Sequence, residues 1–163
     1  MSEYQFERKH CRRCGGCGHY SYNPKDGTVC YGCGGRGSKL TKKGKAANKY
    51  FNSLLETKCS DLKLGDSLWE EKYNPYDHSS TYVWTKITEI KEQGKDDLLI
   101  STKYGAHHVS KNETLQRYPQ DDEGNSTQDA FRALKKVAVE YQSKLTQQGK
   151  LMKKYQNKGE RND

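Results

Sequence analysis

The stretch CRRCGGCG at residues 11–18 and the stretch CYGCGGRG at residues 30–37 are two copies of one pattern, C-x-x-C-x-G-x-G, set 19 positions apart. A C-x-x-C pair lets two thiolates reach the same ion from one tight turn, and two such pairs supply the four sulfurs that structural zinc prefers. The glycines permit the positive φ angles with which each turn directs its N–H groups toward the sulfurs. We predict one closed site, holding one Zn²⁺ per chain, with these ligands: Cys11, Cys14, Cys30 and Cys33.

Other roles for these cysteines are less favoured. No apolar signal segment opens the chain, so we expect a reducing compartment in which disulfides are rare. Cys17 could pair with Cys14 as an alternative C-x-x-C, or supply a fifth thiol near the ion. However, a repeat that starts at Cys14 would have His19 and Ser21 at the positions of its glycines. His10 and His19 offer substitute ligands, and we interpret them as surface histidines. Cys59 lies far along the chain and is interpreted as a small apolar side chain or a free thiol.

The repeat resembles the cysteine-rich zinc domain of DnaJ-type co-chaperones, over about residues 9–38. Members of that family usually carry four copies and two zinc sites, whereas this chain has two copies and therefore one site. The resemblance implies metal ligation by the same four cysteines. No His-Pro-Asp tripeptide occurs in this chain, so the J domain of these proteins is missing and their co-chaperone activity is not implied.

Composition limits the size of any hydrophobic core. The 163 residues suffice for one ordinary domain or two small ones. Only 31% of them are hydrophobic, and the mean hydropathy is −1.18. A metal fits this shortage, because it supplies folding free energy that a short ribbon cannot gain by burial. No stretch approaches the ~20 apolar residues of a membrane span, so we expect a cytoplasmic protein without a membrane partner.

Charge is segregated along the chain. The net charge is +8, with 11 Lys/Arg against 3 Asp/Glu in residues 1–50, 9 against 14 in residues 51–125, and 9 against 4 in residues 126–163. Such segregation is typical of a chain with separate functional parts. The predicted domains are a zinc-binding ribbon (1–40), a basic connector and helix (41–58), a small β domain (59–119), and an acidic linker with a C-terminal helix (120–163).

The predicted fold class is α+β: a DnaJ-like zinc ribbon, a short helix, a small antiparallel β domain and a long C-terminal helix. Apolar residues at helical spacing indicate the short helix over about 45–57. Dense β-branched and aromatic residues predict the strands, at 62–69, 81–90 and 98–102, with further edges at 107–109 and 114–117. They suggest either an SH3-like barrel or an open antiparallel sheet, with Trp69 and Trp84 as core or groove residues.

The C-terminal helix is predicted to begin at Ser126-x-x-Asp129 as a capping box. Gly149 suggests a break near 147–150. An apolar stripe at 3–4 spacing follows the cap, which favours either a helix-mediated homodimer or docking onto the β domain. Its members are Phe131, Leu134, Ala138, Tyr141, Leu145, Met152 and Tyr155.

No catalytic motif stands out, and we predict that the protein is not an enzyme. Gly32-x-Gly34-x-x-Gly37 formally matches a dinucleotide fingerprint, but it overlaps the zinc repeat and no βαβ pattern surrounds it. A zinc ion held by four cysteines has no open position for a reacting water.

Two functions remain. The first is nucleic-acid binding, DNA or RNA, because clustered cations release counterions from phosphates and aromatic rings stack on unpaired bases. The second is a protein-binding adaptor that holds a peptide client or docks on a machine such as RNA polymerase or the ribosome; a virus- or phage-encoded regulator is one hypothesis for such a protein. The candidate nucleic-acid-binding residues are Arg12, Arg13, Arg36, Lys39, Lys42, Lys43, Lys45, Tyr20 and Tyr31.

Overall fold

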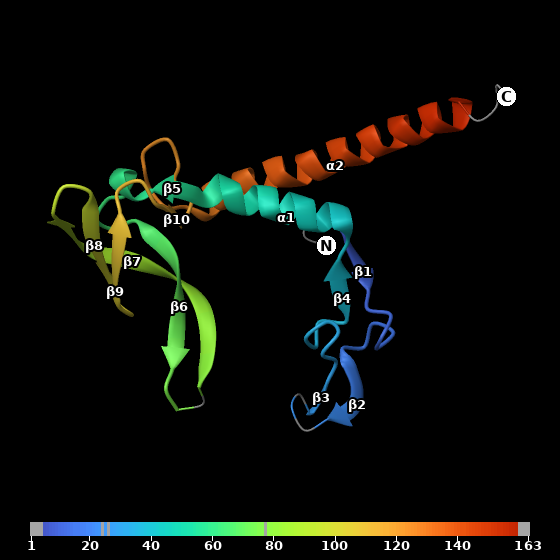
Figure 1. The fold of residues 1–163 in the computed structure, drawn as a ribbon, viewed down its shortest axis with the longest axis horizontal. Coiled ribbons are helices and arrows are strands. Elements are labelled where there is room, and N and C mark those ends of the chain that lie inside the picture. The colour runs from blue at the N-terminus through green and yellow to red at the C-terminus, as the bar shows by residue number, and fades with distance from the viewer. Residues whose placement is uncertain (1–4, 24, 26, 77, 160–163) are drawn as a thin grey trace. The chain divides into compact units, whose positions relative to one another are not determined.

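The computed structural model describes residues 5–159 except 24, 26 and 77, and it divides into two compact units (Figure 1). Unit 1 comprises Met1–Tyr50 and Lys136–Asp163, and unit 2 comprises Phe51–Lys135. The fold is α+β, as predicted, with a small cysteine-rich region, two helices and a curled antiparallel sheet. Each helix has residues in both units.

Unit 1 contains two short antiparallel ribbons. Its strands are β1 (Arg8–His10), β2 (His19–Asn23), β3 (Gly27–Val29) and β4 (Ser38–Leu40). β1 pairs with β4, and β2 pairs with β3. The helices that contribute to this unit are α1 (Lys42–Leu55) and α2 (Gln128–Gly159). The chain therefore leaves one ribbon, forms the other, returns to the first and enters α1.

Small residues line the contact between the helices of unit 1. Ala47 of α1 and Ala138 of α2 are fully buried. The rings of Tyr50 and Tyr141 lie 4.6 Å apart, centroid to centroid, on the same two helices. The Lys43 ammonium also donates to the Thr146 hydroxyl at 3.2 Å, so side chains of α1 and α2 meet within this unit.

The start of α1 is held by the segment that leads into β1. Thr41 caps the helix by accepting the Gly44 N–H on its hydroxyl at 3.1 Å, so α1 begins three residues earlier than predicted. The Thr41 N–H donates to the Glu7 carbonyl at 3.1 Å. A Cβ atom built on Gly44 would collide with that same carbonyl oxygen. Glycine at position 44 is therefore required by packing rather than by backbone conformation.

Gly44→Ala is expected to destabilise unit 1, although alanine in a helix ordinarily stabilises it by about 0.5–1 kcal/mol relative to glycine. The added methyl group meets the backbone of Glu7, which cannot move without breaking its hydrogen bond to Thr41. Gly149→Ala is the matched control, because a Cβ at that helical position meets nothing within 4 Å. Thermal unfolding followed by circular dichroism should give a lower Tm for the first variant and a higher Tm for the second. Equal changes in Tm for the two variants would contradict the close contact between Gly44 and the backbone of Glu7.

α2 differs from the prediction at two points. Its cap is Thr127, whose hydroxyl accepts the Ala130 N–H at 3.2 Å, so the capping box at Ser126 was wrong by one residue. The helix also continues through residues 147–150, where a break was expected. Gly149 does not adopt a positive φ, and a single glycine costs only about 1 kcal/mol in a helix of good helix formers. The side chains of Met152 and Tyr155 lie outside the described residues. No helix in the described part of the chain has the length and apolar character needed to cross a membrane.

Unit 2 is built on a curled four-stranded antiparallel sheet, a half-barrel (Figure 1). Its strands follow chain order and are β6 (Ser67–Asn74), β7 (Ser79–Gln93), β8 (Asp97–Thr102) and β9 (Ala106–Ser110). A separate two-stranded ladder joins β5 (Glu56–Lys58) to β10 (Thr114–Gln116), and a single 3-10 turn, η1 (Cys59–Asp61), follows β5. A register shift between Ile87 and Glu89 marks a bulge in β7. Such a bulge increases strand twist and bends the sheet.

Residues 62–69 were predicted as a short strand around a Gly-Asp turn; the turn is confirmed, but the part before it is not a strand. β6 begins at Ser67 and extends to Asn74, while residues 62–66 form a turn in which Gly65 has φ +88°. The Asp66 carboxylate accepts the Lys63 N–H at 3.0 Å and closes this turn. The strands predicted at 81–90 and 98–102 are confirmed within β7 and β8.

One face of the sheet carries the core of unit 2. Its buried members are Cys59, Leu62, Leu68, Ile87, Leu98, Ile100 and Val109. Glu70 is buried on the same sheet, and its Oε2 lies 2.8 Å from His107 Nε2 and accepts a hydrogen bond from Thr102 Oγ1 at 2.9 Å. The sheet brings these three residues of β6, β8 and β9 together, and no sequence motif indicated them.

The two tryptophans lie opposite each other on β6 and β7. Trp69 and Trp84 are register partners with ring centroids 4.9 Å apart. The row of rings continues from Trp84 to Tyr118 at 5.1 Å and from Tyr118 to Phe131 at 5.3 Å. Trp69 remains 40% exposed, so this row forms a groove surface as well as packing the unit.

Candidate metal centre

The two copies of the cysteine repeat adopt the same backbone geometry. The glycines at the first, second and fourth positions after each C-x-x-C have matched positive φ angles: 61°, 100° and 84° at Gly15, Gly16 and Gly18, and 57°, 75° and 68° at Gly34, Gly35 and Gly37. The copies also bond to each other reciprocally. The Cys11 N–H donates to the Gly37 carbonyl at 2.8 Å, and the Cys30 N–H donates to the Gly18 carbonyl at 2.9 Å. The repeat is therefore a pair of interlocked turns with approximate twofold symmetry.

The interlocked turns bring four sulfurs together. The Sγ atoms of Cys11, Cys14, Cys30 and Cys33 all lie within 4.8 Å of one another. Cys11 Sγ and Cys30 Sγ are 3.9 Å apart, and Cys14 Sγ and Cys33 Sγ are 3.7 Å apart. Tetrahedral coordination at a Zn–S distance of about 2.3 Å requires sulfurs about 3.8 Å apart, whereas a disulfide requires about 2.05 Å. The four cysteines are thus positioned to coordinate one metal ion.

The backbone favours thiolates at this position. Burial raises the pKa of the Cys14 thiol, but hydrogen bonds from the backbone N–H groups of Gly16 and Gly18 outweigh it and lower the pKa to about 6. The Cys14 backbone N–H lowers the pKa of Cys11 in the same way. Burial raises the pKa of Cys33 to about 11, so metal binding must displace a proton from that sulfur. Four thiolates around one cation would leave no position for a water ligand.

Cys17 does not belong to the four-sulfur group. Its side chain is exposed, and its thiol donates to the carbonyl oxygens of Cys14 at 2.9 Å and His19 at 3.2 Å. Cys59 is buried in the core of unit 2, where burial first and the Glu113 carboxylate second raise the pKa of its thiol. Neither thiol is placed to compete for the metal in this arrangement.

Three of the candidate nucleic-acid-binding residues form one stack on the ribbon. The Arg13 guanidinium lies 3.7 Å from the ring centroid of Tyr31 and 4.1 Å from that of Tyr20. The two rings remain 60% and 43% exposed, respectively. A guanidinium between two aromatic faces is held by cation–π attraction, so Arg13 has a structural role that the sequence did not indicate.

The remaining candidates lie on β4, on α1 and on the metal-binding turns. Arg12 and Arg36 are exposed on the turns, Lys39 is exposed on β4, and Lys42 and Lys45 are exposed on α1. Lys43 differs, because its ammonium donates to the Thr146 hydroxyl of α2 at 3.2 Å.

One further cation belongs with this group. The β1–β4 register sets Lys9 directly opposite Lys39 on an exposed two-stranded ribbon. Like charges directly opposite each other on a ladder are destabilising. The sequence did not indicate this pairing, because it depends on the register between β1 and β4. The whole metal-binding segment lies between these two strands along the chain.

Comparisons of the chain with protein-family models, with curated proteins and with solved structures find no match. The geometry of the chain shows four cysteines positioned to coordinate one metal ion, on a ribbon rich in Lys and Arg.

Proposed function

We propose that the protein is a non-enzymatic zinc protein that binds nucleic acid through the basic surface of unit 1. In this proposal Zn²⁺ occupies the four-cysteine site and keeps the ribbon rigid. The surface itself consists of cations on the metal-binding turns, on β1 and β4, and on the first turns of α1. The single observation that carries the proposal is the uncompensated charge of that surface.

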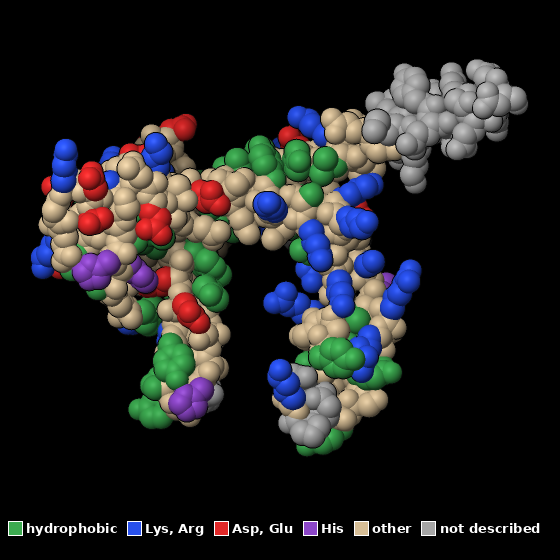
Figure 2. Space-filling model, in the orientation of Figure 1, with side chains coloured by type: hydrophobic (Ala, Val, Ile, Leu, Met, Phe, Trp, Pro, Cys, Tyr) green, Lys and Arg blue, Asp and Glu red, His purple; other side chains and the backbone are tan. Residues whose placement is uncertain are grey.

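Charge is concentrated in unit 1 and lacks acidic partners there. By sequence, unit 1 holds 18 Lys/Arg against 6 Asp/Glu, whereas unit 2 holds 11 against 15. Figure 2 shows Lys and Arg side chains gathered over β1, β4 and the start of α1. Within the described residues, the cations that take part in no ion pair include Arg12, Arg36, Lys9, Lys39, Lys42 and Lys45. A polyanion would neutralise this surface and release its own counterions.

The Lys9–Lys39 pair supports a phosphate ligand in particular. Two ammonium groups held opposite each other cost the free protein about 0.2–1 kcal/mol, which a phosphate between them relieves. The exposed rings of Tyr20 and Tyr31 beside Arg13 offer faces on which unpaired bases stack. The resemblance of residues 9–38 to the DnaJ zinc domain supports zinc as the metal.

The double variant Lys9→Gln/Lys39→Gln is expected to bind nucleic acid more weakly while folding more stably. Because the two lysines share one phosphate in this proposal, the slope of log K against log salt should fall in magnitude by about 0.9 for duplex and about 0.7 for single strands. Removal of the like-charge pair should raise the free energy of unfolding by about 0.2–1 kcal/mol. Fluorescence anisotropy with labelled single- and double-stranded DNA and RNA, at several salt concentrations, measures the first effect. Thermal unfolding measures the second.

The matched control is Lys63→Gln/Lys95→Gln, which removes two exposed lysines from unit 2. It lowers the net charge equally, so any general charge effect appears in both variants. An unchanged salt slope in Lys9→Gln/Lys39→Gln, or an equal change in the control, contradicts a binding surface on unit 1.

A protein-binding adaptor is the second candidate, and a specific surface favours it. Trp69, Tyr73 and Tyr82 on the β6–β7 hairpin are each between 40% and 57% exposed. Exposed aromatic residues are enriched where proteins bind one another. Two results together would favour the adaptor. The protein would not bind nucleic acid at low salt, and it would capture a partner protein that the Tyr82→Ser variant does not capture.

A further inference from the structure

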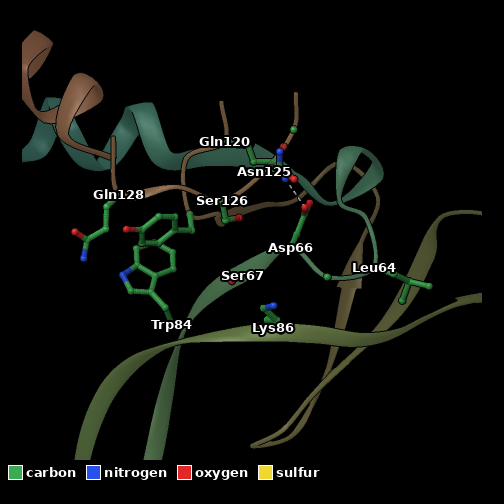
Figure 3. A pocket seen from close by; sticks show the side chains of 12 residues that line it. Leu64, Asp66, Ser67, Trp84, Lys86, Gln120, Asn125, Ser126 and Gln128 are labelled. Carbon is green, nitrogen blue, oxygen red and sulfur yellow. Dashed lines mark hydrogen bonds between the residues drawn. The ribbon is translucent and has the colours of Figure 1, made fainter. Parts of the chain in front are cut away.

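Unit 2 contains a pocket of 580 Å³ on the sheet face that carries the tryptophans (Figure 3). Its lining comes from the turn before β6, from β7, from residues 118–120 and from the residues around the start of α2. Figure 3 shows Trp84 and Gln128 on one side of the pocket, Leu64 on the other, and Lys86 below. Pockets of about 300–1,000 Å³ accommodate small organic ligands.

The free charge of this pocket is positive. Lys86 is exposed and lies opposite Ser67 in the β6–β7 register, and its ammonium makes no ion pair with any described residue. Asp66 is the one carboxylate among the described residues that line the pocket, and it is buried. Its oxygens accept from Gln120 Nε2 at 2.6 Å and from the Lys63 N–H at 3.0 Å, and Arg117 Nη1 lies 3.5 Å away. Because Asp66 is neutralised within the protein, Lys86 sets the charge that a ligand meets.

The pocket also has an aromatic wall and a polar rim. Trp84 and Tyr118 meet at an interplanar angle of 85° and are each partly exposed. On the rim lie two side-chain amides and a hydroxyl, those of Asn125, Gln128 and Ser126. Amide groups both donate and accept hydrogen bonds, as the edge of a nucleobase does. An aromatic wall, one ammonium and two amides therefore line one pocket. Asn125 Nδ2 donates to Glu123 Oε2 and Gln128 Oε1 accepts from Arg132 Nη2, both at 3.4 Å, which leaves Asn125 Oδ1 and Gln128 Nε2 for a ligand.

We infer that this pocket binds a mononucleotide, with its base against Trp84 and Tyr118, the edge of the base near the amides, and its phosphate on Lys86. Other ligands fit the pocket less well. An uncharged sugar would leave the Lys86 ammonium without a partner, and inorganic phosphate would leave the rings of Trp84 and Tyr118 without a ligand group to contact. A basic peptide is disfavoured by Lys86. The nucleotide is either free in solution or an unpaired residue of a strand, and both present the same chemistry. The inference uses no residue of unit 1, so its failure and the failure of the proposed function are distinguishable.

The test is a titration of the full-length, zinc-loaded protein with the four nucleoside 5′-monophosphates and with the matching nucleosides. Both tryptophans of the chain lie in unit 2, so their fluorescence reports on this unit. We expect saturable quenching by at least one monophosphate with Kd on the order of 0.1–1 mM. Lys86→Gln should weaken binding of the monophosphate about two- to fivefold and leave that of the nucleoside unchanged, because the exposed ammonium pairs only with the phosphate. Gln128→Ala should weaken nucleoside and monophosphate equally.

Lys95→Gln, in the β7–β8 turn, is the charge-matched control and should bind as the unaltered protein does. Lys9→Gln/Lys39→Gln should also leave the monophosphate titration unchanged. A short single-stranded oligonucleotide is the second probe. If it binds more tightly than the monophosphate, and if Lys86→Gln weakens its binding, the bound nucleotide is an unpaired residue of a strand. A monophosphate that binds at least as tightly as the oligonucleotide identifies the free nucleotide. Absence of saturable quenching, or equal monophosphate affinity in Lys86→Gln and the unaltered protein, overturns the inference.

Discussion

Removal of the metal is expected to unfold the cysteine-rich ribbon while the β sheet of unit 2 stays folded. Structural zinc contributes about 10–16 kcal/mol of apparent binding free energy, which is comparable with the ~5–15 kcal/mol by which whole domains are stable. Residues 8–40 have little else to hold them, since their strands are three to five residues long and, among the described residues of this segment, the buried apolar side chains are those of Cys11 and Cys30. Cys30→Ser, which replaces a fully buried sulfur, should have the same effect as a chelator.

The measurements for this prediction separate the two units. Metal analysis of the reduced protein should give one zinc per chain, and none in Cys30→Ser. Amide dispersion in ¹H–¹⁵N spectra should collapse for the ribbon residues, while tryptophan fluorescence should stay as it is, since both tryptophans belong to unit 2. Cys17→Ser is the matched control, because that exposed thiol lies outside the four-sulfur group, and it should retain the metal. A metal-free, reduced protein that keeps the ribbon amides dispersed would refute the structural role of the site.

The second large effect is expected from Gly18→Ala and Gly37→Ala. A Cβ on Gly18 would strike the carbonyl oxygen of Gly35, and a Cβ on Gly37 would strike that of Gly16. Both obstacles are backbone atoms of the opposite turn, so they cannot rotate away. Each substitution also places a side chain on a residue whose φ is positive, which alone costs about 1–2 kcal/mol. We expect these variants to bind zinc more weakly by orders of magnitude, because the two turns must separate and the four sulfurs move with them.

Gly15→Ala and Gly34→Ala provide the controls for this prediction. Their φ angles of +61° and +57° impose the same backbone cost, but a Cβ there meets nothing within 4 Å. Competition with a chromophoric zinc chelator should therefore show a smaller decrease in affinity, about 5- to 30-fold, for the controls. Equal decreases in all four variants would show that backbone conformation dominates and that packing between the turns contributes little.

Local patterns predicted much of the architecture. Strands β7 and β8 were recognisable because dense β-branched and aromatic residues favour a strand regardless of what it packs against. Errors arose where two local signals competed. Ser126 and Thr127 are both good caps, and the hydroxyl of Thr127 is the one that reaches a helical N–H. Gly149 is a weak helix former, but its neighbours propagate the helix across it.

Contacts between distant segments could not be predicted in this way. By local propensity Gly44 is a poor helix residue, and its function is evident only once the Glu7 carbonyl lies against it. Glu70 and His107 are 37 residues apart, and the register of the strands brings them to 2.8 Å. In the sequence Arg13 is one more surface cation, whereas in the fold Tyr20 and Tyr31 enclose it.

The amino-acid pattern alone was sufficient to specify the metal ligands, because each C-x-x-C pair acts within one turn and its glycines carry the required backbone conformation with them. The pairing of the two turns, the facing lysines of β1 and β4, and the pocket beside Trp84 arise from three-dimensional folding. Each depends on strand register and on packing between residues far apart in the chain, and no local propensity encodes such distances.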